Sequence, residues 1–356
     1  MSGERVVEID GSYGEGGGQL LRYSVALAAL LRKSVRIYNI RAKRDNPGLR
    51  PQHLTAVKTI VEISGARVKG LSIGSTELYV EPGSRPRGGS FDVDIGTAGS
   101  VSLLLQATLP VLAAADGEVK MTVRGGTDVK WAPPIEYFEH VLLPLLREFG
   151  LEAELKLLRR GYYPQGGGIV EVRVKPSYPL KPVHLVETGG LEEIGGVSYA
   201  SNLPKHVAER QAQAAIDLLK REGYGDYLSE VEIDVETPAV GTGSGIVLWA
   251  KFERGVVGGD ALGEKGKRAE VVGREAAERL LRSLRSGVPV DLHALDNLVI
   301  YMALADGNSR VVSNELTSHA ETAIWLCKLL SNAEFKVEHL GKLIEVMVNG
   351  IGFKPQ

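Results

Sequence analysis

The stretch "VVSNELTSHAETAIWL", residues 311–326, holds the pattern on which the fold of this chain depends. A β-branched run typical of a strand stops, and the cap-like pair Thr317-Ser318 follows it. His319 then stands where a helix is predicted to begin. A histidine at this position is either a packing or capping group or the group that performs chemistry.

The alternation of strand and helix in this stretch belongs to a pattern that occurs three times. Each occurrence predicts the order helix, strand, helix, strand, strand. The first has helices at 20–31 and 52–64, a strand at 34–40, and strands near Arg67 and Glu77; the second has helices at 101–114 and 134–149 and strands at 118–124, 152–157 and 169–174; the third has helices at 292–305 and 319–330 and strands at 309–314, 334–339 and 343–348. Pro144 predicts a kink in its helix. Repeats of this size bury one face of a sheet under two helices.

The segment between the second and third occurrences has a different order. It predicts strands at 194–201, 231–236 and 246–252 and helices at 206–222 and 269–285. We therefore expect an α/β protein with two domains. Residues 1–185 together with 287–356 form a large three-repeat catalytic domain, and residues 186–286 form an inserted α/β domain.

The composition of the 356 residues is that of an ordinary globular protein, with 44% hydrophobic and 24% charged residues and a net charge of −2. Any polyanion must therefore bind to a local patch of charge. The single cysteine, Cys327, excludes an internal disulfide and a cysteine-based zinc site. The N-terminus has no basic-then-apolar signal, and no apolar run reaches membrane-spanning length. We expect a cytoplasmic protein that does not bind membranes.

A glycine-rich turn, "GSYGEGGGQLLR" at residues 11–22, precedes the first predicted helix. Such turns present backbone N–H groups to an anion at a helix N-terminus, although a plain tight turn is an equal alternative. No Gly-Lys-Ser/Thr follows, so this is not a Walker A motif. Glu15 is a candidate metal ligand, because a phosphate next to a carboxylate needs a divalent cation between them. Arg22 falls on the first turns of the helix.

Basic residues are concentrated between positions 32 and 50, where seven of them accompany a single acidic residue, Asp45. Arg41, Arg44 and Arg50 fall in a predicted loop before Gln52 and His53. The planar guanidinium suits phosphate binding, while a solvated surface is the alternative.

Three further features place polar or flexible residues where a binding cleft would need them. Gln106 interrupts an apolar helix, as do the adjacent Asp296 and Asn297. The stretch "RRGYYPQGGG", residues 159–168, is either a surface loop or a place where the backbone approaches a ligand. With no cofactor fingerprint and no hydrolase triad, the pattern favours phosphate chemistry on a repeated scaffold.

Several motifs resemble those of the RNA 3′-terminal phosphate cyclase family. They are "GEGGGQLLR" (14–22), "NPGLRPQHLTAV" (46–57), "RGGTDVKWAPP" (124–134), "RGYYPQGGGIV" (160–170), "LPKHVAER" (203–210) and "GEKGKRAE" (263–270). The fourth is similar to the family signature Arg/His-Gly-x-x-Pro-x-Gly-Gly-Gly. The resemblance covers nearly the whole chain.

The resemblance implies a large domain of three β-α-β-α-β-β units with a smaller inserted α/β domain. It also implies a ligase reaction in which ATP and a divalent metal, Mg²⁺ or Mn²⁺, convert an RNA 3′-phosphate into a 2′,3′-cyclic phosphodiester. The enzyme is first adenylylated on a histidine, with release of diphosphate. AMP then passes to the RNA 3′-phosphate, and the neighbouring 2′-hydroxyl expels it. The implied partners are ATP and RNA 3′-phosphate ends, and the sequence leaves a homo-oligomer open.

The resemblance also assigns roles to individual residues. His319 matches the nucleophilic histidine, and a neutral imidazole is a competent nucleophile near pH 7. Glu15 would contact the metal. The nucleotide contacts would come from Gln106, Pro133, His293, Ala294, Leu295, Asp296 and Asn297. The triphosphate or the RNA terminal phosphate would be held by Arg22, Arg41, Arg44, Gln52 and His53. Asn297 departs from the glutamine common in the family, which puts that one nucleotide contact in question.

Two other functions fit the same scaffold. Non-catalytic members of the fold family act in ribosome assembly, but they lack the nucleophilic histidine that is present here as His319. A small-molecule transferase on a related repeat scaffold is the other alternative, and the basic cluster and the family signature count against it.

Overall fold

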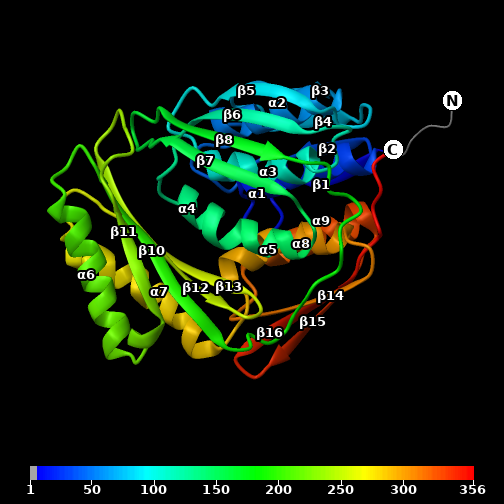
Figure 1. Ribbon diagram of the computed structural model, residues 1–356. Helices are drawn as coiled ribbons and strands as arrows, with labels where there is room; N and C mark the ends of the chain where they lie inside the picture. The colour runs from blue at the N-terminus through cyan, green and yellow to red at the C-terminus, as the bar shows by residue number, and fades with distance from the viewer. Residues whose placement is uncertain (1–5) are drawn as a thin grey trace.

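The computed structural model describes residues 6–356, and its secondary structure alternates between helices and four mixed sheets of four strands each. This confirms the predicted α/β class. In Figure 1, helices α1, α3, α8 and α9 lie between the sheet of β5–β8 on one side and strands β14–β16 on the other.

The first sheet has the strand order β1-β2-β4-β3, in which β1 and β2 are parallel and the other pairs are antiparallel. Its elements are β1 (Val7–Asp10), α1 (Gly18–Leu31), β2 (Val35–Tyr38), α2 (Pro51–Ser64), β3 (Arg67–Lys69) and β4 (Leu78–Glu81). Residues 20–30 of α1 are all buried, as expected of a helix covered on every side by other elements.

The second sheet repeats this order as β5-β6-β8-β7, again with its first pair parallel. Its elements are β5 (Gly89–Asp94), α3 (Val101–Leu112), β6 (Val119–Gly125), α4 (Ile135–Tyr137), the π-helical turn η1 (Phe138–Leu142), α5 (Leu143–Glu148), β7 (Ala153–Arg159) and β8 (Gly168–Val174). The single helix predicted at 134–149 is thus divided. Because Pro144 has no N–H to offer and its ring crowds the preceding turn, the backbone widens into η1 before α5 begins.

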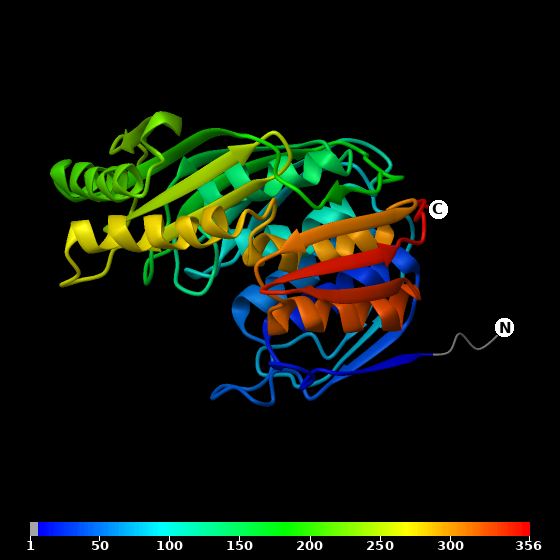
Figure 2. The same ribbon diagram turned by 90° about the horizontal axis from the view of Figure 1, so that it is seen from below.

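The third sheet has the order β9-β14-β16-β15, with β9 parallel to β14. Its elements are β9 (His184–Leu185), α8 (Leu292–Leu304), β14 (Asn308–Ser313), α9 (Ser318–Ser331), β15 (Glu334–Leu340) and β16 (Leu343–Asn349). Figure 2 shows β14, β15 and β16 lying over α8 and α9. The single cysteine, Cys327 of α9, is buried and free.

The fourth sheet comes from the chain between β9 and α8 and has the order β11-β10-β12-β13. Its elements are β10 (Leu191–Ser201), α6 (His206–Arg221), the 3₁₀ turn η2 (Gly225–Tyr227), β11 (Leu228–Asp234), β12 (Gly243–Phe252), β13 (Val256–Leu262) and α7 (Ala269–Ser286). Helices α6 and α7 cover its outer face (Figure 1). The buried apolar residues of this sheet and its helices form most of a second hydrophobic cluster, separate from the main core.

Four strands carry no clear sequence signal and were not predicted: β1, β5, β9 and β13. β9 is only two residues long, and in β5 the one buried residue is Val93. β13 contains Gly258 and Gly259, and adjacent glycines are typical of a turn. A Cβ on Gly259 would stand 2.4 Å from the carbonyl oxygen of Ala276 in α7, so the glycine is required by the close approach of helix and strand.

Candidate functional site

His319 lies in the first turn of α9 with its ring partly open to solvent. Thr317 is the N-cap, and its hydroxyl accepts a hydrogen bond from the N–H of Ala320 at 3.0 Å. The side chain of His319 is 46% exposed, and its Nδ1 lies 3.0 Å from Oε1 of Gln19 in α1. The ring is therefore fixed in orientation by α1 without being packed into the core.

The environment of His319 favours the neutral imidazole. Burial lowers the pKa of His319, and the neighbouring Arg22 and Arg44 lower it further, while Glu15 acts in the opposite direction. With Oε1 of Gln19 accepting from Nδ1–H, the lone pair resides on Nε2. Nε2 lies 3.6 Å from a carboxylate oxygen of Glu15. The geometry places Nε2 of His319 beside the glycine-rich turn, and the lowered pKa favours the neutral form that is nucleophilic.

The glycine-rich turn before α1 packs directly against α9. Glu15 accepts a hydrogen bond from the hydroxyl of Ser318 at 2.5 Å, and Nη2 of Arg44 lies 3.3 Å from its other oxygen. Gly14 has a φ of +58°, and a Cβ there would stand 2.5 Å from Oγ1 of Thr322. The left-handed backbone and the close approach to α9 explain why this position is glycine.

Arg22 and His53 form a buried cationic and polar pocket beside the same turn. Arg22 is 4% exposed, forms no ion pair among residues 6–356, and leaves Nε without a hydrogen-bond partner there. Burial lowers the pKa of Arg22 to about 10. Burial also lowers the pKa of His53 to about 3, and its Nδ1 accepts from the N–H of Arg50, so Nε2 carries the proton. A buried guanidinium without a counter-ion, beside an N–H donor, is suited to an anion.

Gly18 connects this pocket to the turn. A Cβ on Gly18 would stand 2.2 Å from Nε2 of His53 and 2.9 Å from Nη1 of Arg22. Any side chain at position 18 would therefore collide with both donors.

The other three predicted phosphate contacts lie around this pocket, each with a partner of its own. Arg41 has a φ of 55°, and its guanidinium donates to the carbonyl oxygens of Asn46 and Gly48 at 2.6 and 2.9 Å. Arg41 thus also holds its own loop. Arg44 is exposed and contacts Glu15, and Oε1 of Gln52 accepts from the N–H of Ser100 at 3.2 Å. Gln52 therefore joins the N-terminus of α2 to that of α3.

The predicted nucleotide-binding segment of α8, residues 293–297, combines a polar pair with buried apolar side chains. Asp296 accepts a hydrogen bond from the hydroxyl of Thr317, and burial raises the pKa of Asp296 to about 7. Asn297 accepts from Tyr23 at 3.2 Å and donates to the carbonyl oxygen of His293 at 2.8 Å. Ala294 and Leu295 are fully buried, so their side chains face the core. The polar pair thus lies between the start of α9 and α1.

Gln106 and Pro133 lie at a separate part of the site, beside α3. The hydroxyl of Ser102 donates to the carbonyl oxygen of Pro133 at 2.7 Å and also contacts Ser100, the N-cap of α3. Gln106 is one turn further along the helix and is 9% exposed. The carbonyl of Pro133 is thereby joined through Ser102 and Ser100 to Gln52.

A divalent cation at this site would depend on Glu15. Among residues 6–356 no group of three or more His, Cys, Asp or Glu side chains is arranged to hold a metal. Mg²⁺ commonly binds through one or two carboxylates together with substrate phosphates and water. Glu15, partly exposed beside the cationic pocket, fits that donor set.

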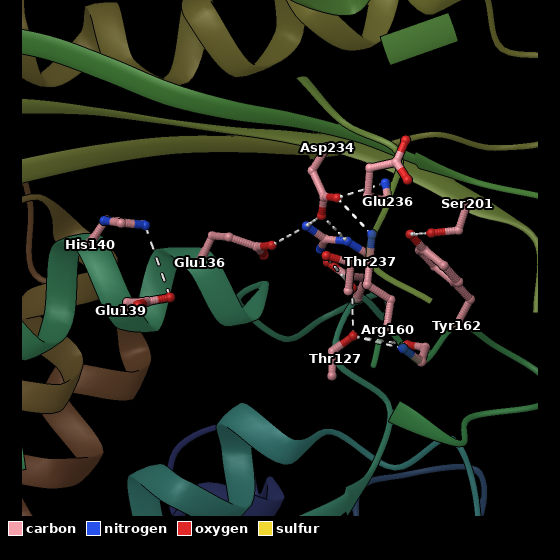
Figure 3. Close-up of polar contacts among 12 residues, drawn as sticks. Thr127, Glu136, Glu139, His140, Arg160, Tyr162, Ser201, Asp234, Glu236 and Thr237 are labelled. Carbon is pink, nitrogen blue, oxygen red and sulfur yellow. Dashed lines mark hydrogen bonds and ion pairs between the residues drawn. The ribbon is translucent and has the colours of Figure 1, made fainter. Parts of the chain in front are cut away.

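Arg160, the first residue of the family signature, was not predicted as a site residue, and its guanidinium is 1% exposed. Figure 3 shows it in contact with Glu136 and Asp234. It pairs with Glu136 at 2.5 Å, Asp234 at 2.7 Å and Asp128 at 3.5 Å, and it stacks 3.8 Å from the ring centroid of Tyr199. Gln19, Thr317 and Ser318 were also missed. Thr317 and Ser318 gave only the local signal of a helix cap, and Gln19 gave none, because their contacts at the site join segments distant in sequence.

Comparisons with known proteins give a consistent result. The family model described as RNA 3′-terminal phosphate cyclase matches residues 13–337. A protein of that name from Pyrobaculum neutrophilum is 49% identical over 98% of this chain and 99% of its own. Proteins of the same name from Methanopyrus kandleri and Nitrosospira multiformis are 52% and 49% identical over 90% and 95% of this chain and 92% and 95% of theirs. Among the described residues, no helix is long and apolar enough to cross a membrane.

Proposed function

The chain belongs to the RNA 3′-terminal phosphate cyclase family, and from this premise we propose that it uses ATP to convert an RNA 3′-phosphate into a 2′,3′-cyclic phosphodiester. AMP and diphosphate are the other products. The single observation that carries the residue assignment is the partly exposed imidazole of His319, whose pKa is lowered by burial, near the buried Arg22, which has no ion-pair partner among residues 6–356.

In the first step, Nε2 of His319 attacks the α-phosphorus of ATP. A nitrogen–phosphorus bond forms, the bond from the α-phosphorus to the bridging oxygen breaks, and diphosphate leaves. Gln19 supports this role by accepting a hydrogen bond from Nδ1, which keeps the lone pair on Nε2. The N-terminus of α9 adds backbone N–H groups and a partial positive charge, which favour the phosphate and disfavour a charged imidazole.

In the second and third steps, an oxygen of the RNA 3′-phosphate takes AMP from His319, and the ribose 2′-hydroxyl then attacks the RNA phosphorus. The bond between that phosphorus and the oxygen of AMP breaks, the hydroxyl loses its proton, and the cyclic ester remains. Arg22 and the Nε2–H of His53 would hold the triphosphate of ATP in the first step or the terminal phosphate of the RNA in the later ones, with Arg41, Arg44 and Gln52 around them. Holding only the end of the RNA is compatible with a net charge near zero.

The nucleotide contacts follow from the two remaining parts of the site. Asp296 and Asn297, with His293, would bind the nucleotide from the side of α8. Gln106 and Pro133 would bind it from the side of α3. Ala294 and Leu295 have buried side chains, so in this proposal they position the polar pair. Glu15 would hold Mg²⁺ or Mn²⁺, which when bound neutralises charge on the phosphates.

The architecture supports a further part of the proposal. Three sheets share one strand order and one pattern of parallel and antiparallel pairs, so we propose that they are copies of one β-α-β-α-β-β unit. Residues 186–286 interrupt the third copy after β9 and form the inserted domain. Residues 1–185 with 287–356 form the catalytic domain.

The direct test of the activity is incubation of the protein with ATP, Mg²⁺ and a short RNA ending in a 3′-phosphate. The expected product resists phosphatase, and the same RNA ending in a 3′-hydroxyl should remain unchanged. A protein that binds the RNA but leaves its phosphate open to phosphatase would instead favour the non-catalytic assembly factor.

A further inference from the structure

Trp131 has a conformation and an exposure that the fold does not explain. Its side chain is 94% exposed, although burial of a tryptophan would stabilise the protein. Its φ of 61° lies in the left-handed region, which is unfavourable for a bulky side chain. Strained residues of this kind are concentrated at ligand sites.

A second exposed aromatic residue lies on the neighbouring loop. Tyr163 is 79% exposed, and it belongs to the loop between β7 and β8. The two loops pair at their bases, where Asp128 and Tyr162 form a parallel bridge. Two flat, exposed rings therefore project from adjacent loops.

Both loops rest on the start of α3, next to the proposed phosphate pocket. Trp131 is two residues from Pro133, whose carbonyl is joined through Ser102 and Ser100 to Gln52. On the other loop, a Cβ on Gly166 would stand 2.9 Å from Cα of Ala98, two residues before Ser100. The aromatic residues thus lie at the edge of the site.

Arg160 connects the bases of the two loops, and Figure 3 shows its ion pair with Glu136. Its guanidinium contacts Asp128 and Glu136, which are the two ends of the loop that carries Trp131. Arg160 itself begins the loop that carries Tyr163. Rigid bases reduce the entropy that a ligand must overcome when it orders the tips.

We propose that Trp131 and Tyr163 form a stacking surface for the bases of the last nucleotides of the RNA substrate. The proposal rests on the cyclase function proposed above and adds to it a site for the RNA bases. Stacking on an aromatic ring accepts every base, because each base has a π-face. The nearby Lys130 is paired with Glu264 at 2.9 Å. The loop is therefore better suited to stack on the bases of the RNA than to bind its phosphates.

The test separates the RNA-dependent step from the RNA-independent one. We expect Trp131→Ala and Tyr163→Ala each to raise the KM for a 3′-phosphate RNA about ten-fold, while labelling of the protein by ATP in the absence of RNA stays at the wild-type level. Trp131→Phe, which keeps a flat ring, should restore most of the loss. Tyr227→Ala, an exposed aromatic residue of η2 in the inserted segment, is the matched control and should change neither quantity.

The outcomes distinguish the two proposals. A wild-type protein that is not labelled by ATP contradicts the proposed function. If labelling is normal and Trp131→Ala leaves the KM for RNA unchanged, the stacking surface is wrong. A fall in ATP labelling in Trp131→Ala would also overturn it, because the ring would then serve the nucleotide of the first step.

Fluorescence gives a second readout that does not depend on turnover. Trp249 and Trp325 are stacked on His140 and Tyr13, so Trp131 is the tryptophan open to a base. Addition of the RNA should quench the emission of the wild type and leave that of Trp131→Phe nearly unchanged. Equal quenching in both proteins would contradict the stacking surface.

Discussion

At the scale of one residue, Arg22 shows that a side chain suited to binding a ligand can lower the stability of the free protein. A guanidinium removed from water needs compensating partners, and the described part of the chain supplies it with none in an ion pair. In the proposed function, an anionic substrate provides the missing partner. The family resemblance marked Arg22 as a phosphate contact, but its burial and its lack of an ion-pair partner could not be deduced from sequence.

We therefore predict that Arg22→Met makes the free protein more stable, by about 1 kcal/mol or more, while it weakens phosphate binding. Chemical denaturation of the free protein measures the first effect. The rise in melting temperature caused by ATP measures the second and should shrink in the variant. A variant less stable than the wild type, with an unchanged response to ATP, would show that Arg22 is an ordinary structural residue.

At the scale of elements, the site is made where helices α1, α2, α3 and α9 begin. Sequence identified the Thr317 cap and most of the helices because these signals are local. It could not show that Gln19 of α1 reaches His319 of α9, a contact 300 positions apart. The short or glycine-containing strands were missed because their pairing depends on neighbours in space.

Gly18 and Gly17 provide a matched pair at this scale. We predict that Gly18→Ala lowers labelling by ATP at least about ten-fold, because its Cβ would displace His53 and Arg22 and a small misplacement of binding groups is costly. Gly17→Ala should retain labelling, since its Cβ would meet only the end of the Arg44 side chain, at 3.2 Å. Equal activity of the two variants would contradict the described pocket.

At the scale of the whole molecule, Arg160 joins the loop that carries Pro133 to the sheet of β10–β13. Asp128 and Glu136 come from one side, and Asp234 and Tyr199 from the other. The signature motif was recognised in the sequence as a glycine-rich loop, but its arginine could be understood only after the inserted segment was placed against it. The boundaries of the inserted domain remain a proposal based on the order of elements.

Removal of the Arg160 guanidinium should weaken the contact between this loop and the sheet. We predict that Arg160→Met costs about 3–5 kcal/mol of unfolding free energy, because three carboxylates lose their partner. Arg173→Met removes an exposed pair with Glu118 at 3.8 Å and should cost less than about 1 kcal/mol. Urea denaturation compares the two, and similar losses would refute a central role for Arg160.

Glu136, one of the carboxyl groups around Arg160, should make the stability of the protein depend on pH. Burial, with the nearby Asp128, raises the pKa of Glu136 well above its usual range despite the opposing effect of Arg160. The folded state therefore holds a proton that the unfolded state releases near pH 4.5, and this contribution to stability is lost as the pH rises towards neutrality. Relative to the wild type, Glu136→Gln should gain stability between pH 5 and pH 8. A difference that stays constant or falls over this range in urea denaturation would contradict the assignment.

The central claim, that His319 forms a bond to phosphorus, is tested most directly by incubating the protein with Mg²⁺ and ATP labelled at its α-phosphate. The account predicts a label on the protein that is labile in acid and stable in base, as expected of a phosphoramidate. The label should be absent from His319→Ala and normal in His184→Ala, which alters an exposed histidine of β9. A His319→Ala protein that is labelled as well as the wild type would contradict the account.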